Sequence, residues 1–180
     1  MPLTNEELAK IDPVENLKNR PSKDDYFLAL AFVVARKSFD PSSKCGCVIV
    51  SKDGRILATG YNGPLPDSND VEVPLIRPDR YYVMIHGEEN ALLAYSGSYT
   101  DIQGATAYIT GRFCHRCLRM LLRKGITRLV YGKNDTACVD KEDLRAQELL
   151  LRDRKDVIIV EKTNHEVKKI LENAIKELGV

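Results

Sequence analysis

The chain has 180 residues, of which 43% are hydrophobic and 29% charged, a composition typical of a folded globular protein with a sizeable core. Lysine plus arginine is 27 and aspartate plus glutamate is 26, so the formal net charge of +1 argues against a dedicated nucleic-acid-binding protein. Five cysteines, with no secretory signal and no membrane-spanning apolar run, predict a cytoplasmic protein with reduced thiols instead of a disulfide framework.

The N-terminal residues differ from the rest of the chain. Residues 1–21 are polar and interrupted by Pro13, so we expect an N-terminal arm with a short helix, followed by one domain over residues 22–180. Ser22 is a typical helix N-cap, and apolar residues continue this helix to about Phe39. The wide apolar surface of the helix predicts packing against a sheet.

Two strands follow. Residues 45–50 predict a buried strand that turns at residues 51–54 into a second strand over residues 55–60. Cys45 and Cys47 lie on one face of the first strand. We interpret them as small apolar core residues, and a second metal site is the alternative.

The remaining chain alternates between helices and strands. Residues 61–82 predict a long loop with four prolines, and loops of this length in compact domains are often functional. We then expect helices after residue 86, over residues 114–124 and 141–151, and from residue 164, with strands over residues 105–110, 128–131 and 157–160. This alternation predicts a three-layer α/β/α domain with a central mixed five-stranded sheet, whose site lies at a sheet edge where two helices begin.

Two short motifs contain the residues that a catalytic metal centre needs. A His-x-Glu motif supplies His86 and Glu88, and a Cys-x-x-Cys motif supplies Cys114 and Cys117. One imidazole and two thiols are ligands that zinc takes, and three protein ligands leave the fourth position open for water. Glu88, two residues from a ligand at a helix start, is placed to move that water's proton. Helix N-termini also favour thiolates.

These motifs resemble the zinc-dependent nucleobase deaminases, whose signature is His-x-Glu followed by Pro-Cys-x-x-Cys. Further segments are similar to the deoxycytidylate deaminase branch, and the resemblance covers about Ser22 to Glu161. The chain departs from the family pattern at Gly87, where the family has alanine, and at Phe113, where it has proline. We expect Phe113 to affect substrate fit more than zinc binding. The similar segments are Asp25-Tyr26-Phe27, Ala31-Phe32, Ala35-Arg36, Asp40-Pro41, Gly60-Tyr61-Asn62-Gly63, Glu88-x-Asn90-Ala91 and Gly125-Ile126.

The resemblance implies a zinc-dependent hydrolase that deaminates a cytosine deoxynucleotide, with dCMP converted to dUMP and ammonia. Zinc would be held by His86, Cys114 and Cys117, and Glu88 would be the catalytic residue. The resemblance also implies a homo-oligomer, often a hexamer, and in some members control by dCTP and dTTP. The loop after Gly63 departs from the family pattern, which leaves such control open.

The candidate substrate-binding residues rest on fewer sequence observations than the metal ligands do. By resemblance, Asn62 binds the sugar, and a backbone carbonyl near Arg112 and Phe113 holds the amine. Three residues near the loop before the first strand are candidate donors to the 5′-phosphate, with ordinary loop polarity as the alternative. They are Arg36, Ser43 and Lys44.

The helix after the first Cys also carries an arginine stripe, formed by Arg116, Arg119 and Arg123. At 100° per residue these arginines lie nearly opposite the two thiols, so we expect them to face away from the zinc. A solvated face is the favoured interpretation; a subunit contact and a phosphate site shared between subunits are the alternatives. Arg112 precedes the helix and could extend to the mouth of the site.

Several other functions compete with a nucleotide deaminase. A thioredoxin-type redox pair explains Cys-x-x-Cys but not His-x-Glu. A structural zinc site needs a fourth ligand, for which Cys138 is the remaining candidate. A catalytically silent zinc-binding subunit would explain Phe113, but Glu88 is retained. Among deaminases, the near-neutral charge favours a small nucleotide, with another base or a nucleic-acid base as the alternative.

Overall fold

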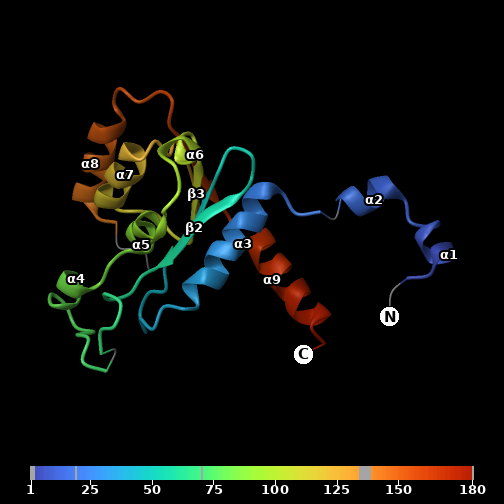
Figure 1. Ribbon diagram of the computed structural model, residues 1–180, viewed down its shortest axis with the longest axis horizontal. Helices are drawn as coiled ribbons and strands as arrows, with labels where there is room; N and C mark the ends of the chain where they lie inside the picture. The colour runs from blue at the N-terminus through green and yellow to red at the C-terminus, as the bar shows by residue number, and fades with distance from the viewer. Residues whose placement is uncertain (1–2, 19, 70, 134–138, 180) are drawn as a thin grey trace.

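The computed structural model describes residues 3–18, 20–69, 71–133 and 139–179, so Cys138 lies outside the described residues. Two short helices, α1 (Asn5–Leu8) and α2 (Pro13–Lys18), extend away from the body of the molecule (Figure 1). No helix in the described part of the chain is long and apolar enough to cross a membrane.

A mixed sheet of five strands forms the centre of the body. Its strand order is β2-β1-β3-β4-β5. β1 pairs antiparallel with both β2 and β3, whereas β3 with β4 and β4 with β5 are parallel. The predicted mixed five-stranded sheet is therefore confirmed. The strands are β1 (Gly46–Val50), β2 (Ile56–Tyr61), β3 (Thr106–Ile109), β4 (Arg128–Gly132) and β5 (Ile158–Lys162).

Two helices cover one face of the sheet. They are α3 (Lys23–Ala35) and α9 (His165–Glu177), which pack against each other as well as near the strands. Val48 and Val50 of β1 point to this side and are buried with Val130 of β4. Because successive strand residues point to opposite faces, the residues between them must be buried on the other side.

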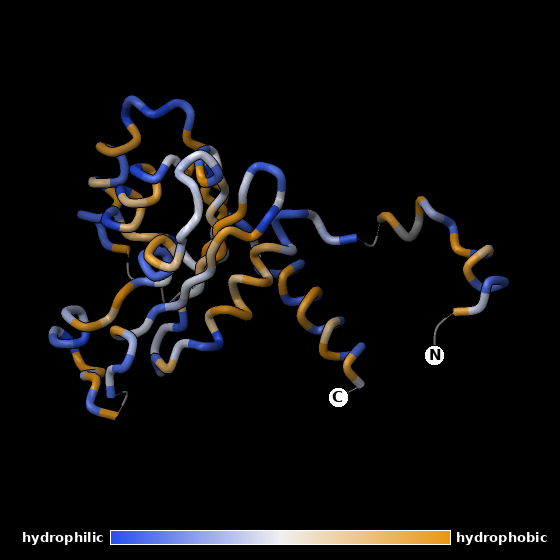
Figure 2. The backbone as a smooth tube through the Cα atoms, in the orientation of Figure 1, coloured by the Kyte–Doolittle hydropathy of each residue, from blue (hydrophilic) through white to orange (hydrophobic). Residues whose placement is uncertain are grey.

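Three helices cover the second face, α5 (Gly87–Ala94), α7 (His115–Arg123) and α8 (Lys141–Leu151). Cys47 and Ile49 of β1 are fully buried in this core. Apolar residues lie along the strands and α3, whereas the loop between α8 and β5 is hydrophilic (Figure 2). The three-layer α/β/α prediction is confirmed. Cys47 is a core residue as interpreted from the sequence, whereas Cys45 is only partly buried.

A close approach of backbone to backbone fixes α5 on the sheet. A Cβ atom at Gly60 of β2 would lie 2.2 Å from the Ala91 nitrogen and 2.3 Å from the Gly87 oxygen, so only glycine fits. A Cβ atom at Gly87 would lie 3.2 Å from the Cys45 oxygen, a tight contact that requires a small residue. The first turn of α5 is thus held against β2 at the sheet edge.

Two one-turn helices lie in segments that the sequence predicts as loops, α4 (Arg80–Val83) and α6 (Tyr99–Ile102). Arg80 of α4 donates to the carboxylate of Asp40 and to the Ser43 hydroxyl at 2.9 Å. The Asp40 side chain is fully buried. This ion pair ties the long loop before α5 to the loop before β1.

Candidate active site

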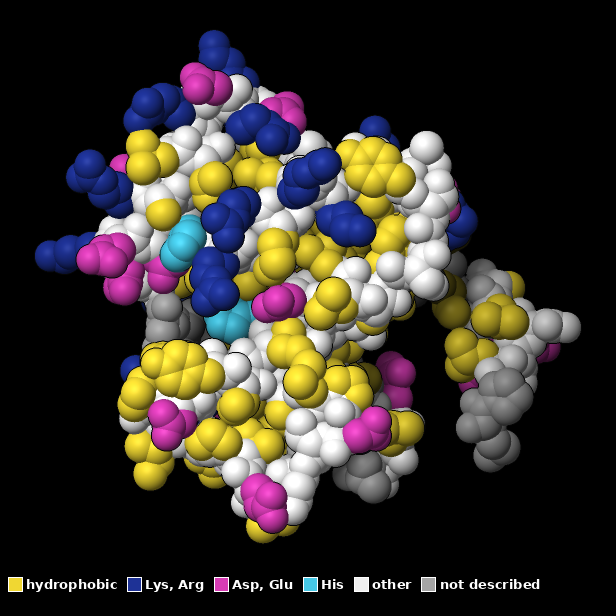
Figure 3. Space-filling view, turned by 60° about the vertical axis from the view of Figure 1, so that its left-hand side comes forward, with side chains coloured by type: hydrophobic (Ala, Val, Ile, Leu, Met, Phe, Trp, Pro, Cys, Tyr) yellow, Lys and Arg dark blue, Asp and Glu magenta, His cyan; other side chains and the backbone are white. Residues whose placement is uncertain are grey.

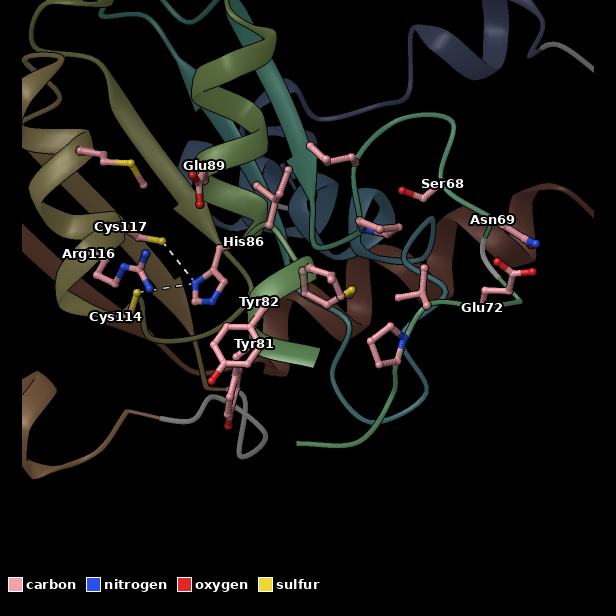
Figure 4. Close-up of a pocket in the computed structure, with 18 of the residues that line it drawn as sticks. Ser68, Asn69, Glu72, Tyr81, Tyr82, His86, Glu89, Cys114, Arg116 and Cys117 are labelled. Atoms are coloured by element: carbon pink, nitrogen blue, oxygen red, sulfur yellow. Dashed lines mark hydrogen bonds between the residues drawn. The ribbon is translucent and has the colours of Figure 1, made fainter. Parts of the chain in front are cut away.

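The two motifs meet where α5 and α7 begin. His86 is the N-cap residue of α5 and Cys114 is the N-cap residue of α7, and neither side chain makes a capping hydrogen bond. Cys117 lies in the first turn of α7. His86 Nδ1 is 3.6 Å from Cys114 Sγ and 3.4 Å from Cys117 Sγ (Figure 4). Both helices therefore direct their N-terminal ligands to one point.

The spacing of these donor atoms fits zinc. In a tetrahedral zinc site, usual Zn–N and Zn–S bond lengths place a nitrogen and a sulfur ligand roughly 3.5 Å apart. The three ligand atoms all lie within 4.8 Å of one another. Among the described residues, this triad is the group of His, Cys, Asp and Glu side chains placed to hold a metal ion. Neither Cys45 nor Cys47 belongs to a metal-ligand group among the residues that the structure describes.

The triad is strongly coupled electrostatically. A hydrogen bond from Cys117 lowers the pKa of Cys114 to about 4, and the same contact raises the pKa of Cys117. The hydrogen bond with Cys114 raises the pKa of His86 to about 9. Zinc takes thiolates and a neutral imidazole as ligands, so its affinity for these three residues is expected to fall as the pH falls.

Glu88 lies in the first turn of α5, with only 4% of its surface exposed. Burial raises the pKa of its carboxyl, although the nearby His86 charge and a hydrogen bond with Cys117 oppose the shift. A carboxyl with a raised pKa beside a metal site is typical of a general acid–base. The next residue, Glu89, lines the cavity described below, whereas Glu88 is buried and is not among the residues that line it.

A cavity of about 620 Å³ opens onto the triad. This volume is within the range of small-molecule sites. One wall comes from residues 64–69 and 72–74 of the predicted long loop. Tyr81 and Tyr82 of α4 also line the cavity and lie between these loop residues and the Cys residues in the view of Figure 4. Figure 3 shows Lys and Arg side chains gathered along one side of the hollow, next to a histidine.

Two members of the arginine stripe line this cavity, Arg116 and Arg119. The expectation that they face away from the zinc was wrong. Helical side chains lean toward the N-terminus, so long side chains in the first turns of α7 extend back over the end where Cys114 lies. Arg123, one turn further along, lines a separate hollow with Lys52.

Asn62 is buried and hydrogen-bonded within the protein. Its Oδ1 accepts from the Cys45 N–H at 2.7 Å, and its Nδ2 donates to the Ser43 carbonyl at 2.9 Å and to Asp40 at 3.3 Å. It holds the loop before β1 and does not line the cavity. A role in sugar binding stays a prediction.

The three candidate phosphate donors lie elsewhere. Arg36 is exposed just after α3, Lys44 donates to the Ser38 carbonyl, and the Ser43 hydroxyl accepts from Arg80. None of the three lines the cavity that contains the triad. The structure thus does not bring them to the candidate metal site.

Phe113 is buried in the protein interior, whereas Arg112 is half-buried and lines a separate hollow with Tyr131 and Glu161. Phe113 is 1% exposed and packs edge-on against Tyr131, with ring centroids 5.9 Å apart. Arg112 stacks over the same ring at 5.7 Å, and neither residue lines the cavity. The Phe113 ring, at the position of the family's proline, fills the core below the turn. Arg112 does not extend to the mouth of the site.

Sequence reasoning missed two residues of α8 that contact the Cys turn. Asp143 Oδ1 accepts from the His115 N–H at 2.9 Å, and Gln147 Nε2 donates to the Phe113 carbonyl at 2.9 Å. The feature that marks them is the burial of Gln147 within α8, and this is visible only once the fold is known.

The family follows from comparison with known proteins. Residues 21–133 match the family model described as the cytidine and deoxycytidylate deaminase zinc-binding region. The chain therefore belongs to the cytidine and deoxycytidylate deaminase family, which confirms the resemblance and the zinc cofactor. The Cys-x-x-Cys motif is thus part of a zinc-binding region and not a thioredoxin-type redox pair.

Within that family, several similar proteins are named deoxycytidylate deaminases. A probable deoxycytidylate deaminase of Drosophila melanogaster is 32% identical over 154 residues, covering 79% of this chain and 71% of that protein. The deoxycytidylate deaminase of Mycobacterium phage D29 is 35% identical over 132 residues, covering 64% of this chain and 98% of that protein. The chain spans 62% of the length of the human deoxycytidylate deaminase, at 30% identity over 59% of this chain.

Solved structures agree with the fold. The dCMP deaminase of cyanophage S-TIM5, in complex with dCMP and dUMP, superposes with a TM-score of 0.61 and 22% sequence identity. The superposition covers 79% of this chain and 98% of that one. The cytidine-deaminase-like fold predicted from the motifs is therefore confirmed.

Proposed function

We propose that the protein is a zinc-dependent hydrolase that converts dCMP and water to dUMP and ammonia. The observation that carries this proposal is the triad of His86, Cys114 and Cys117, with the buried carboxyl of Glu88 beside it, at the base of a nucleotide-sized cavity. The names of the relatives and the nucleotides bound to the cyanophage enzyme support the choice of a cytosine deoxynucleotide.

The residues divide the chemistry between them. Zinc held by His86, Cys114 and Cys117 would supply a water whose pKa is lowered to near neutrality. Glu88 would accept one proton from the attacking water as the water oxygen bonds to C4 of cytosine, and would pass this proton to N3. Glu88 would then move the remaining proton, on the new C4 hydroxyl, to the amino group, so that the C4–N bond breaks, C4=O forms and ammonia leaves. The raised pKa of Glu88 suits both directions of transfer.

Arg116 and Arg119 are the proposed ligands of the 5′-phosphate, because they line the same cavity as the triad. Guanidinium groups bind phosphate through paired N–H donors. They replace Arg36, Ser43 and Lys44 as the preferred candidates, since those residues lie outside the cavity.

Replacing Arg116 or Arg119 with glutamine is expected to raise KM for dCMP by about tenfold or more, because a charge-assisted phosphate contact is worth about 1.5–3 kcal/mol. Turnover of deoxycytidine, which has no phosphate, should be unchanged. Arg123→Gln is the matched control, since Arg123 lies on the same stripe but outside the cavity. Equal losses with dCMP and deoxycytidine would contradict the assignment.

Substrate choice can be measured as ammonia release by zinc-loaded protein. The panel contains cytidine, adenosine and guanosine nucleosides, their ribo- and deoxy-mono- and triphosphates, and a short single-stranded oligonucleotide. Among the nucleotides of the panel we expect activity on dCMP alone, and deoxycytidine should react only slowly. Salt-sensitive activity on the oligonucleotide would instead favour a nucleic-acid base. Silence across the panel with zinc bound would favour the catalytically silent subunit.

Three further features stay predictions within this proposal. They are a homo-oligomer with hexamers as the expected form, control by dCTP or dTTP, and a cytoplasmic location.

A further inference from the structure

Helix α8 contacts the backbone on both sides of the zinc ligand Cys114. Asp143 Oδ1 accepts from the N–H of His115, the residue after the ligand, at 2.9 Å. Gln147 Nε2 donates to the carbonyl of Phe113, the residue before it, at 2.9 Å. Asp143 and Gln147 are four residues apart on α8 and therefore share one helical face. The ligand lies between two hydrogen bonds from one rigid element.

The first of these bonds replaces a missing helix cap. An N-cap side chain normally accepts from the backbone of the first turn, but Cys114 makes no such bond and its sulfur faces His86. The first-turn N–H groups of α7 need acceptors from elsewhere. Asp143 supplies one to His115, and its carboxylate also contacts the ring Nδ1 of His115 at 2.5 Å.

The second hydrogen bond, from Gln147, restrains the turn before Cys114, where Phe113 is at the position of the family's proline. A proline fixes its own φ angle and has no N–H, whereas Phe113 leaves the backbone before Cys114 freer. The Gln147 bond to the Phe113 carbonyl, together with the buried Phe113 ring, holds that backbone in place. The departure from the family pattern is therefore matched by a restraint from α8.

Gln147 is itself locked by its surroundings. It is 2% exposed, and its Oε1 accepts from Arg112 Nη2 at 3.2 Å. Arg112 stacks over Tyr131 of β4, whose hydroxyl donates to Glu161 of β5 at 2.7 Å. The contact with the Cys turn is thus connected to two strands of the sheet.

From this geometry we propose that Asp143 and Gln147 are positioning residues that set the geometry of the zinc centre by holding the backbone on both sides of Cys114. The inference rests on the metal centre of the proposed function and not on the identity of the substrate. Partners outside the ligand shell typically contribute about 10- to 100-fold to metal affinity.

The test compares zinc affinity among α8 variants, by competition with a chromophoric chelator. Gln147→Met keeps the length and helix propensity but makes no hydrogen bonds, and Asp143→Ala removes the acceptor. We expect each to bind zinc about tenfold more weakly than the unsubstituted protein. Asp143→Asn keeps an acceptor oxygen and should restore affinity. Glu148→Gln, at an exposed position of the same helix, should change nothing.

A second readout separates positioning from general stability. In Co²⁺-substituted protein, the thiolate charge-transfer and d–d bands should shift in Gln147→Met and Asp143→Ala, because the ligand geometry changes. A lower Tm of the metal-free variants with unchanged zinc affinity and unchanged bands would overturn the proposal. If Gln147→Met fails to fold, comparison of Asp143→Ala with Asp143→Asn decides whether α8 positions the zinc ligand. Absence of zinc binding by the unsubstituted protein would instead overturn the proposed function.

Discussion

Replacing Glu88 with glutamine is expected to lower turnover of dCMP by at least about a hundredfold, the lower range of what a positioned general acid–base contributes. Glutamine has the shape of glutamate but cannot accept a proton from water. Zinc should stay bound at the same stoichiometry, because the proposed ligands are His86, Cys114 and Cys117 and not Glu88. The measurements are ammonia release and metal content of the purified variant.

The adjacent residue provides a matched control. Glu89 carries the same carboxyl on the same turn and lines the cavity, whereas Glu88 is buried. Glu89→Gln should retain most of the activity. If Glu89→Gln loses turnover and Glu88→Gln keeps it, the proton transfer belongs to Glu89.

Replacing Cys117 with alanine is expected to abolish stable zinc binding and, with it, turnover. The change removes one of three protein ligands, and a metal that binds only the folded state also stabilises that state. Metal analysis should find zinc in the unsubstituted protein and almost none in the variant. Added zinc should raise the Tm of the former but not of the latter.

Cys47 is the matched control for this substitution. It is a fully buried cysteine of the same core, on β1, and it is not part of the triad. Cys47→Ala should lose some stability and keep zinc. Full zinc retention in Cys117→Ala, or zinc loss in Cys47→Ala, would show that the ligand set is wrong.

The regular elements could be predicted because they bury periodic patterns. The helix over residues 141–151 was predicted with its observed bounds, and each predicted strand lies within two residues of its observed position. The single turns α4 and α6 were missed because one helical turn is too short to show a period.

The candidate zinc ligands could be predicted because the residue types and spacing within two short motifs are typical of a metal site. His86, Cys114 and Cys117 do converge, as their motifs indicated. Asp143 and Gln147 could not be predicted, since their contact with the Cys turn depends on how α8 packs against α7. The arginine stripe was misplaced because a helical wheel gives the direction of Cβ and not the extent of a long side chain.

The ion pair between Arg80 and Asp40 makes two distant segments depend on each other. The Asp40 carboxylate is fully buried, and the Asn62 amide donates to it at 3.3 Å. Loss of Arg80 would leave an uncompensated buried charge, a situation that costs about 3–5 kcal/mol. The segment before α5 and the loop before β1 are therefore linked through one buried ion pair, and a substitution at Arg80 is expected to weaken the same loop that Asn62 holds.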